Sequence, residues 1–151
     1  MQLTQKESDL LKDLKDAEKL CIEKYTKHAA AAKDTQLSQL FNQIAGVEKQ
    51  HLSTLDKIGE GSVPQCGGGQ SQLPMTFSPT YGTAPDPFKL GDSYLCSDIL
   101  SMEKHVSHTY DTCVFEFKDE QLRCVLNEIQ SDEQHHGKLI YDYMSVNNMY
   151  S

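Results

Sequence analysis

The sequence predicts an all-α protein, an antiparallel four-helix bundle built from two duplicated helical hairpins. Three observations lead to this prediction. Apolar residues recur at helical spacing in four segments, at about 4–33, 34–58, 92–117 and 119–146. A Gly/Pro-rich stretch at about 59–91 separates the first pair of segments from the second. The second pair also repeats motifs of the first pair, at an offset of 85 residues.

The first hairpin carries clear signals for the ends of its helices. Thr4 and Glu7 form the Thr-x-x-Glu pattern of a capping box, so the first helix is expected to begin there and to reach about Lys33. Asp34 is a good N-cap for the second helix, and Gly59 can end it. A short connection of this kind predicts two helices that lie side by side.

Residues 59–91 are expected to form a crossover without helix, because they contain all five prolines and most of the glycines. A helix of about 27 residues is roughly 40 Å long, so joining two parallel helices of a bundle requires a connection of that length. Phe77, Tyr81 and Phe88 leave two alternatives open, docking along the bundle or a disordered spacer.

The second hairpin is expected to begin at Asp92 or Ser93, since either can cap a helix. Asp119 is the expected cap of the fourth helix, and the last residues, 147–151, are expected to fray. The whole chain, 1–151, is long enough for a single domain with its own core.

The two hairpins read as an internal duplication. Residues 33–51 and 118–136 are identical at eight of nineteen positions. A repeat of this length indicates a duplicated supersecondary unit. Two such units related by a pseudo-twofold axis would place equivalent side chains on opposite sides of one centre.

Each half carries one glutamate that is followed thirty residues later by a Glu-x-x-His motif. The six residues are Glu18, Glu48 and His51 in the first half, and Glu103, Glu133 and His136 in the second. Positions i and i+3 of a helix share a face, so each Glu-x-x-His pair projects in one direction. Such a set on four helices is the ligand arrangement of a dinuclear carboxylate site.

The placement of the four glutamates favours metal binding, because all four lie within apolar stripes where carboxylates are rare. Burying an unpaired charge costs several kcal/mol, and two divalent cations would balance four carboxylates. Carboxylates with imidazoles suit iron or manganese, with zinc as an alternative occupant. We expect Glu48 and Glu133 to be shared between the two ions. Glu18 and Glu103 would be terminal ligands, and His51 and His136 would hold one ion each.

Two tyrosines follow the terminal glutamates by seven residues, on the same helix face. Tyr25 follows Glu18, and Tyr110 follows Glu103. Their hydroxyls could orient a ligand carboxylate on a neighbouring helix. The alternative is a pair of core aromatic residues whose hydroxyls are satisfied elsewhere.

Composition excludes several classes of function. A net charge of −8 without a basic cluster argues against nucleic-acid binding, and no run of about 20 apolar residues predicts a membrane span. The N-terminus lacks the pattern of a signal peptide, so synthesis and retention inside a cell are expected. The five cysteines are expected to be reduced thiols, with an intermolecular disulfide through Cys66 as the alternative.

The order Glu, Glu-x-x-His, Glu, Glu-x-x-His resembles the ferritin-like superfamily over all four helices, with the central loop unmatched. The segments from Glu18 to Tyr25 and from Glu103 to Tyr110 are similar to the Glu-x6-Tyr helices of rubrerythrin. Val106 stands where rubrerythrin has an additional glutamate, and a rubredoxin-type four-cysteine site is absent from the sequence.

The opening Leu3-Thr4-Gln5-Lys6-Glu7-Ser8-Asp9-Leu10-Leu11-Lys12-Asp13-Leu14 and the segment Asp34-x-Gln36-Leu37 are similar to the spore coat F family. This resemblance implies a ferritin-like protein of the spore coat, in contact with other coat proteins or with a second copy of itself. Two functions are then expected. One is oxidation of Fe(II) or breakdown of peroxide at a di-iron or di-manganese site. The other is a structural coat component in which metal is absent or only stabilising.

Overall fold

The computed structural model describes residues 2–67 and 75–149, and these residues contain four helices and no strand. The helices are α1 (Gln5–Ala31), α2 (Thr35–Gly59), α3 (Pro87–Glu116) and α4 (Glu120–Val146). The prediction of an all-α chain with four long helices is therefore confirmed. Within the described residues, none of these helices is long and apolar enough to cross a membrane.

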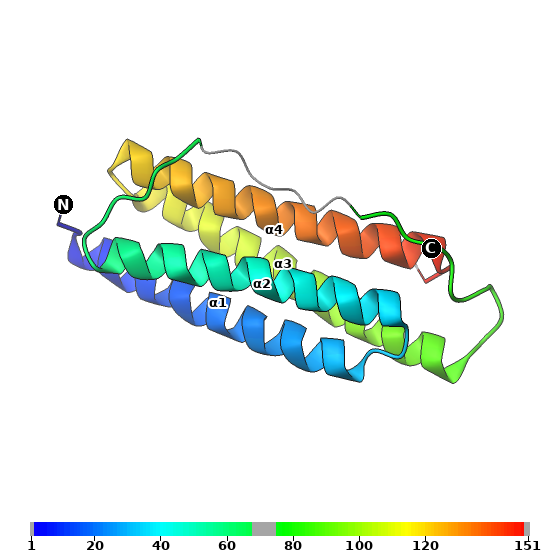
Figure 1. Ribbon diagram of the computed structural model, residues 1–151. Helices are drawn as coiled ribbons and strands as arrows, with labels where there is room; N and C mark the ends of the chain where they lie inside the picture. Colours follow the sequence, from blue (N-terminus) through cyan, green and yellow to red (C-terminus); the bar gives the residue numbers. More distant parts are fainter. Residues whose placement is uncertain (1, 68–74, 150–151) are drawn as a thin grey trace.

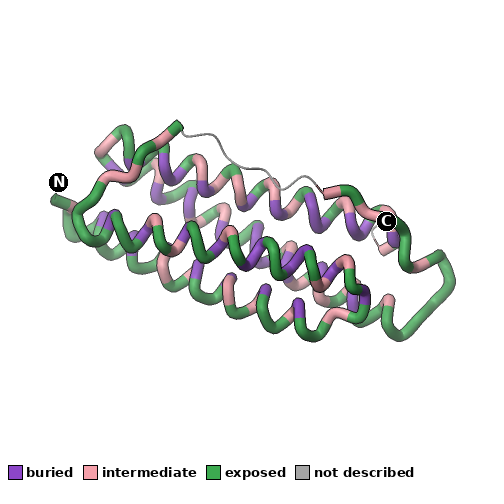
Figure 2. Tube along the Cα trace, viewed as in Figure 1, coloured by how far each residue is buried: buried purple, intermediate pink, exposed green. Residues whose placement is uncertain are grey.

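The four helices lie alongside one another as a bundle (Figure 1). The strongest packing is between α1 and α2 and between α3 and α4, the pairs joined by short connections. Contacts between α1 and α3, with fewer between α2 and α4, join the two hairpins. Buried residues follow the inward side of every helix, as Figure 2 shows, which is the pattern of an amphipathic helix packed on a common core.

The predicted helix starts are observed at three of the four helices. The Thr4 hydroxyl accepts a hydrogen bond from the Glu7 backbone N–H at 3.1 Å, and the Glu7 carboxylate accepts one from the Thr4 N–H at 2.9 Å. Asp34 caps α2 and Asp119 caps α4 through their side chains. Each cap satisfies an N–H group that has no partner inside the helix.

The start of α3 differs from the prediction. The helix begins at Pro87, five residues before the expected position, and its N-cap is Asp86, which accepts from the Phe88 N–H at 2.7 Å. Proline fits the first helical position because its missing N–H would be unpaired there and its φ is already helical. The expectation that all of 59–91 lacks helix was therefore wrong for residues 87–91. The other predicted ends agree within one or two residues.

Asp92, which the sequence predicted as a cap, instead lies inside α3 and is 1% exposed. Its carboxylate accepts hydrogen bonds from the backbone N–H groups of Lys33 (2.8 Å) and Asp34 (2.9 Å), and so holds the turn between α1 and α2. Glu7 of α1 does the same for the other hairpin by accepting from the Lys118 N–H at 3.1 Å. The two carboxylates stand 85 residues apart, at equivalent positions of the repeat.

The described parts of the connection between α2 and α3, residues 60–67 and 75–86, run along α4 (Figure 1). The ring of Phe77 packs edge-on against Tyr143 with centroids 5.5 Å apart, and the Asn147 side chain accepts from the Thr80 and Tyr81 N–H groups. Of the two alternatives, docking is observed for Phe77 and Tyr81, whereas Phe88 belongs to α3 and is 59% exposed. Residues 68–74 lie outside the described residues.

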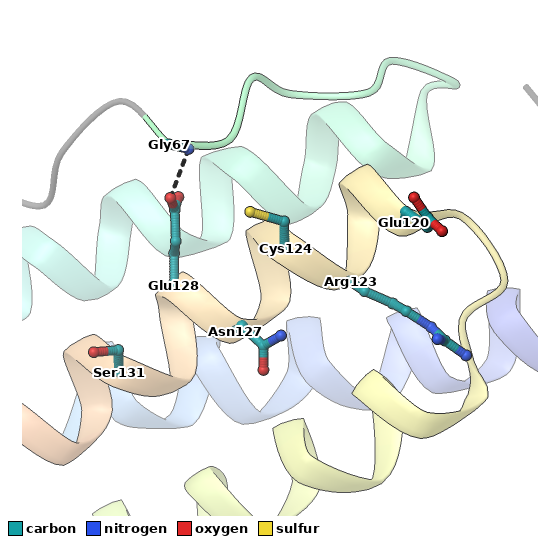
Figure 3. A pocket seen from close by; sticks show the side chains of 7 residues that line it. All are labelled: Gly67, Glu120, Arg123, Cys124, Asn127, Glu128 and Ser131. Carbon is teal, nitrogen blue, oxygen red and sulfur yellow. Dashed lines mark hydrogen bonds between the residues drawn. The ribbon is translucent and has the colours of Figure 1, made fainter.

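A disulfide joins Cys66 of this connection to Cys124 of α4, across 58 residues of sequence. The expectation that all cysteines are reduced was therefore wrong, and so was the alternative of an intermolecular bond through Cys66. The pairing depends on where the connection crosses α4, which the spacing of the cysteines could not indicate. Figure 3 shows Cys124 and Glu128 on this side of α4, where Glu128 accepts a hydrogen bond from the Gly67 N–H at 2.7 Å. Cys21, Cys96 and Cys113 are free and buried.

Candidate metal centre

The structure brings all six predicted ligand residues together in the middle of the bundle. Each helix contributes one glutamate, and α2 and α4 each add the histidine one turn later. All six side chains are buried, with 0–5% of each residue exposed. The set is Glu18 on α1, Glu48 and His51 on α2, Glu103 on α3, and Glu133 and His136 on α4.

The six residues form two overlapping groups of ligand atoms. The first consists of Glu18, Glu48, His51 and Glu133, and the second of Glu48, Glu103, Glu133 and His136. Within each group, one ligand atom from every residue lies within 4.8 Å of the others. Glu48 and Glu133 belong to both groups, so the arrangement offers two adjacent cation positions with two shared carboxylates. Either group can hold a metal ion.

The Nδ1 atoms of the two histidines face equivalent carboxylates. Nδ1 of His51 lies 2.9 Å from a carboxylate oxygen of Glu133, on the opposite hairpin, and 3.6 Å from Glu48 on its own helix. Nδ1 of His136 lies 3.0 Å from Glu48 and 3.9 Å from Glu133. Each imidazole therefore faces the glutamate of its own Glu-x-x-His motif and the glutamate of the other motif.

Eight polar atoms of this cluster are buried and have no hydrogen-bond partner. They are Oε2 of Glu18 and of Glu103, both carboxylate oxygens of Glu48 and of Glu133, and Nδ1 of His51 and of His136. The short Nδ1–oxygen distances thus lack hydrogen-bond geometry. Buried polar atoms are nearly always paired, because leaving one unpaired costs free energy. Oxygens and imidazole nitrogens that converge without bonding one another are the donor set of a divalent cation, so these residues fit a metal pair.

The electrostatics of these six side chains also favour the binding of cations. Burial, together with the neighbouring charge of Glu133, raises the pKa of Glu48 and of Glu103 well above the ordinary range. Burial opposes the charged form of both imidazoles, but the surrounding carboxylates outweigh it and raise the pKa of His51 and of His136. The cluster must therefore take up positive charge, either as protons or as cations.

The two tyrosines reach across the bundle to the glutamates of the opposite hairpin. The Tyr25 hydroxyl donates to Oε1 of Glu103 at 2.7 Å, and the Tyr110 hydroxyl donates to Oε1 of Glu18 at 2.6 Å. Both tyrosines are 0% exposed. Burial, together with the charges of Glu103 and Glu18, raises the pKa of each phenol, so both remain proton donors. Each hydroxyl orients one oxygen of its carboxylate and leaves the other oxygen unpaired.

Asp132 is a residue of the site that the sequence did not reveal. Its carboxylate lies 2.8 Å from Nε2 of His51. An Nε2–H that donates to Asp132 leaves the lone pair of Nδ1 free to face the cluster, which is how ligand histidines are usually oriented. In the sequence, only its position next to Glu133 indicates that Asp132 could belong to the site. The duplication was misleading here, because Val47 is the equivalent residue of the first half.

A third group of ligand-type atoms lies at the surface, where Cys66, Cys124 and Glu128 come together beside a pocket of about 610 Å³ on α4 (Figure 3). Its two sulfur atoms are joined in the disulfide. Thiolates are the form in which cysteine binds metal, so this group offers no thiolate ligand while the bond is intact. The buried cluster is therefore the stronger candidate for metal binding.

Comparison with known proteins finds a similarity in the C-terminal part of the chain. Residues 91–151 match the family model of the Coat F domain. This part contains Glu103, Glu133 and His136, whereas Glu18, Glu48 and His51 precede it. No curated protein and no solved structure matches the chain. Most of α3 and all of α4 thus match the Coat F domain, and this match supports the predicted relation of the chain to the spore coat F family.

Proposed function

We propose that this chain is a ferritin-like protein of the spore coat whose bundle binds two divalent metal ions and reacts with peroxide or oxygen. In this proposal the chain is one domain, 1–151, of two antiparallel hairpins that arose by duplication and are joined by the Gly/Pro-rich crossover. The ions are iron or manganese, with zinc as an alternative occupant, and the reaction is oxidation of Fe(II) or decomposition of peroxide.

The observation that carries the proposal is the set of eight buried atoms without hydrogen-bond partners. These atoms come only from the six residues that the repeated motif singles out. A purely structural polar cluster would be expected to satisfy its own groups. Because the oxygens and nitrogens converge without pairing, two cations would satisfy them together and would balance the four carboxylates.

Each residue has a defined part in the proposed centre. Glu48 and Glu133 belong to both groups and would bridge the two positions, and Glu18 with His51 and Glu103 with His136 would complete them. Asp132 orients the His51 ring. Tyr25 and Tyr110 hold the terminal carboxylates by their Oε1 atoms, so that Oε2 is left for the cation. Iron or manganese, when bound, supplies the one-electron redox chemistry that no side chain of this cluster has.

The second candidate is a structural coat component in which metal is absent or only stabilises the bundle. The disulfide and the docked connection favour it, because both add rigidity to α4 without serving the cluster. Exposed apolar side chains at the start of α3, Phe88, Leu90 and Tyr94, offer contacts for other coat proteins or for a second copy. A structural role would also allow contacts through the tail around Tyr150, which lies outside the described residues.

The experiment that tests the proposal is metal content per chain by elemental mass spectrometry. The protein is purified without chelators and without a His-tag, beside the variant Glu48→Ala/Glu133→Ala. About two iron or manganese ions per chain, lost in the variant, would support the dinuclear centre. A metal-free parent, with a variant at least as stable, would reject it and leave the structural role.

A reaction assay then separates the two functions. Anaerobic protein loaded with Fe(II) is exposed to air or to hydrogen peroxide, and near-ultraviolet absorption and peroxide consumption are followed. The redox function predicts that an absorption band of the oxidised iron develops and that peroxide disappears. An unchanged spectrum and a constant peroxide concentration, in protein that holds two ions, would favour the structural function.

A further inference from the structure

A pocket of about 450 Å³ lies between α3 and α4, and its lining includes two of the predicted ligands, Glu103 and Glu133. Both carboxylates have oxygens without a hydrogen-bond partner, and the two residues are only 2% and 0% exposed. The pocket therefore lies on the outer side of the cluster, and two of the residues in its wall carry carboxylates that face inward. Of the two cation positions, the pocket lies beside the one formed with His136, because Glu103 belongs only to that group.

Gly137 of α4 lines this pocket. Glycine inside a helix is less stable than alanine, so its presence in α4 needs a reason. Packing does not require it, since a Cβ at this position would meet only a methyl group of Leu100, at an ordinary contact distance of 3.6 Å. The consequence of glycine here is that no side chain occupies this part of the pocket.

The first hairpin carries apolar side chains at the equivalent positions. Leu52 stands where the second hairpin has Gly137, and Ile22 stands where it has Ser107. Both apolar side chains are half-buried. The two hairpins thus carry the same inner ligands, but only the second combines them with a glycine and a serine along the approach to those ligands.

The charges at the pocket select what can enter. Lys104 of α3 and Lys138 of α4 both line it, and both residues are exposed. Lys138 is paired with Asp142, with Nζ 2.5 Å from the carboxylate oxygen. Because Asp142 offsets the charge of Lys138, the ammonium group of Lys104 is the charge that favours neutral molecules and small anions over free cations.

We propose that this pocket is the binding site through which a small neutral or anionic oxidant reaches the centre, at the position formed by Glu103 and His136. Hydrogen peroxide and dioxygen are of this class, and azide is a stable probe of it. The inference rests on the proposed function, because the oxidant would bind at a metal ion. Gly137 keeps the route open, and Lys104 favours occupants that are not cations.

The test measures azide affinity by visible absorption of the metal-loaded protein, after metal content per chain has been determined. Gly137→Leu fills the pocket and is expected to weaken azide binding at least tenfold, with two ions per chain retained. The matched control is Gly46→Leu, since Gly46 is an exposed helical glycine whose Cβ would meet nothing within 4 Å. This control is expected to bind azide as the parent does.

A second pair of variants decides the question if Gly137→Leu does not fold. Lys104→Glu reverses a charge at the pocket and is expected to weaken azide binding several-fold. Its control is Lys19→Glu, the equivalent exposed position of α1, which is expected to have no effect. Equal azide affinity in Lys104→Glu and Lys19→Glu, with two ions per chain, would overturn the pocket proposal alone. A parent without metal would overturn the proposed function and this inference with it.

Discussion

The hairpin of α1 and α2 and the hairpin of α3 and α4 are alike inside the bundle and different outside it. Inside, equivalent glutamates, histidines and tyrosines face one cluster, and each tyrosine bonds the terminal glutamate of the other hairpin. Outside, α4 carries the disulfide and contacts the docked connection, which also bonds Gln36 of α2. It also carries Gly137, where α2 has Leu52.

This difference teaches which parts of a duplicated unit are constrained by shared geometry. A ligand in one hairpin is completed by ligands from the other, so a change on one side would leave buried polar atoms of both sides unpaired. Side chains on the surface have no such buried partner in the other hairpin, so they are free to diverge. Asp132 lies between these two classes of position. It contacts His51 from the opposite hairpin, yet the equivalent residue of the first half is Val47.

The largest expected effect comes from removing metal, which should weaken both hairpins together. A ligand at 1,000 times its Kd stabilises the native state by about 4 kcal/mol, so chelation should lower the melting temperature by roughly 8–16 °C for a chain of this size. Thermal unfolding with and without chelator measures the shift. Glu48→Ala/Glu133→Ala should show no shift, and an unaffected parent would contradict the prediction.

Reduction of the disulfide should affect only the α4 side. Closing a loop of 58 residues stabilises the native state by about 4 kcal/mol through the entropy of the unfolded chain. Cys66→Ser/Cys124→Ser should lose that stability in urea unfolding and keep the parental metal content. A reductant should destabilise the parent and leave the double variant unchanged. Loss of metal in the double variant would show that the connection supports the cluster.

The two tyrosines should respond equally, which tests whether the interior is symmetric. Tyr25→Phe removes the hydroxyl bonded to Glu103, and Tyr110→Phe removes the one bonded to Glu18. Losing such an orienting hydrogen bond should weaken metal binding about tenfold in either variant, as measured by titration with a competing chelator. Tyr143→Phe is the control, because its hydroxyl bonds Asp34 instead. Unequal losses would show that one position dominates.

The smallest effect concerns the carboxylate that holds the turn of the second hairpin. Burial opposes the charged form of Glu7, but backbone hydrogen bonds from Thr4 and Lys118 outweigh it and lower its pKa below the ordinary 4.5. A lowered pKa stabilises the fold above about pH 4.5, and this stability is lost as the pH falls through the folded-state pKa. Glu7→Gln should therefore cost about 1 kcal/mol near neutral pH.

Urea unfolding at pH 7 and at pH 3.5 checks this prediction, with the difference between parent and Glu7→Gln shrinking at the lower pH. Asp92→Asn provides the comparison at the other hairpin, where the same kind of carboxylate holds the turn between α1 and α2. A constant difference between parent and Glu7→Gln at both pH values would show that the charge of Glu7 does not contribute.

Much of the molecule was accessible from the sequence because it depends on local spacing. Helical periodicity and caps such as Thr4 and Asp34 predicted four helices, with every end except the start of α3 within one or two residues. The Glu-x-x-His repeat identified six residues that the structure indeed brings together. The start of α3 differs from the prediction because proline usually excludes helix. Pro87, however, stands at the first helical position, where proline is favoured.

The sequence by itself determined the helices, the repeated motifs and the six inward side chains, since period and spacing along one chain are enough to place residues on a helix face. Only the tertiary structure decided the disulfide between Cys66 and Cys124, the contact of Asp132 with His51, and the pocket beside Gly137. These features join residues far apart in the chain. Their geometry arises when the helices pack and the connection settles on α4, and no local pattern encodes it.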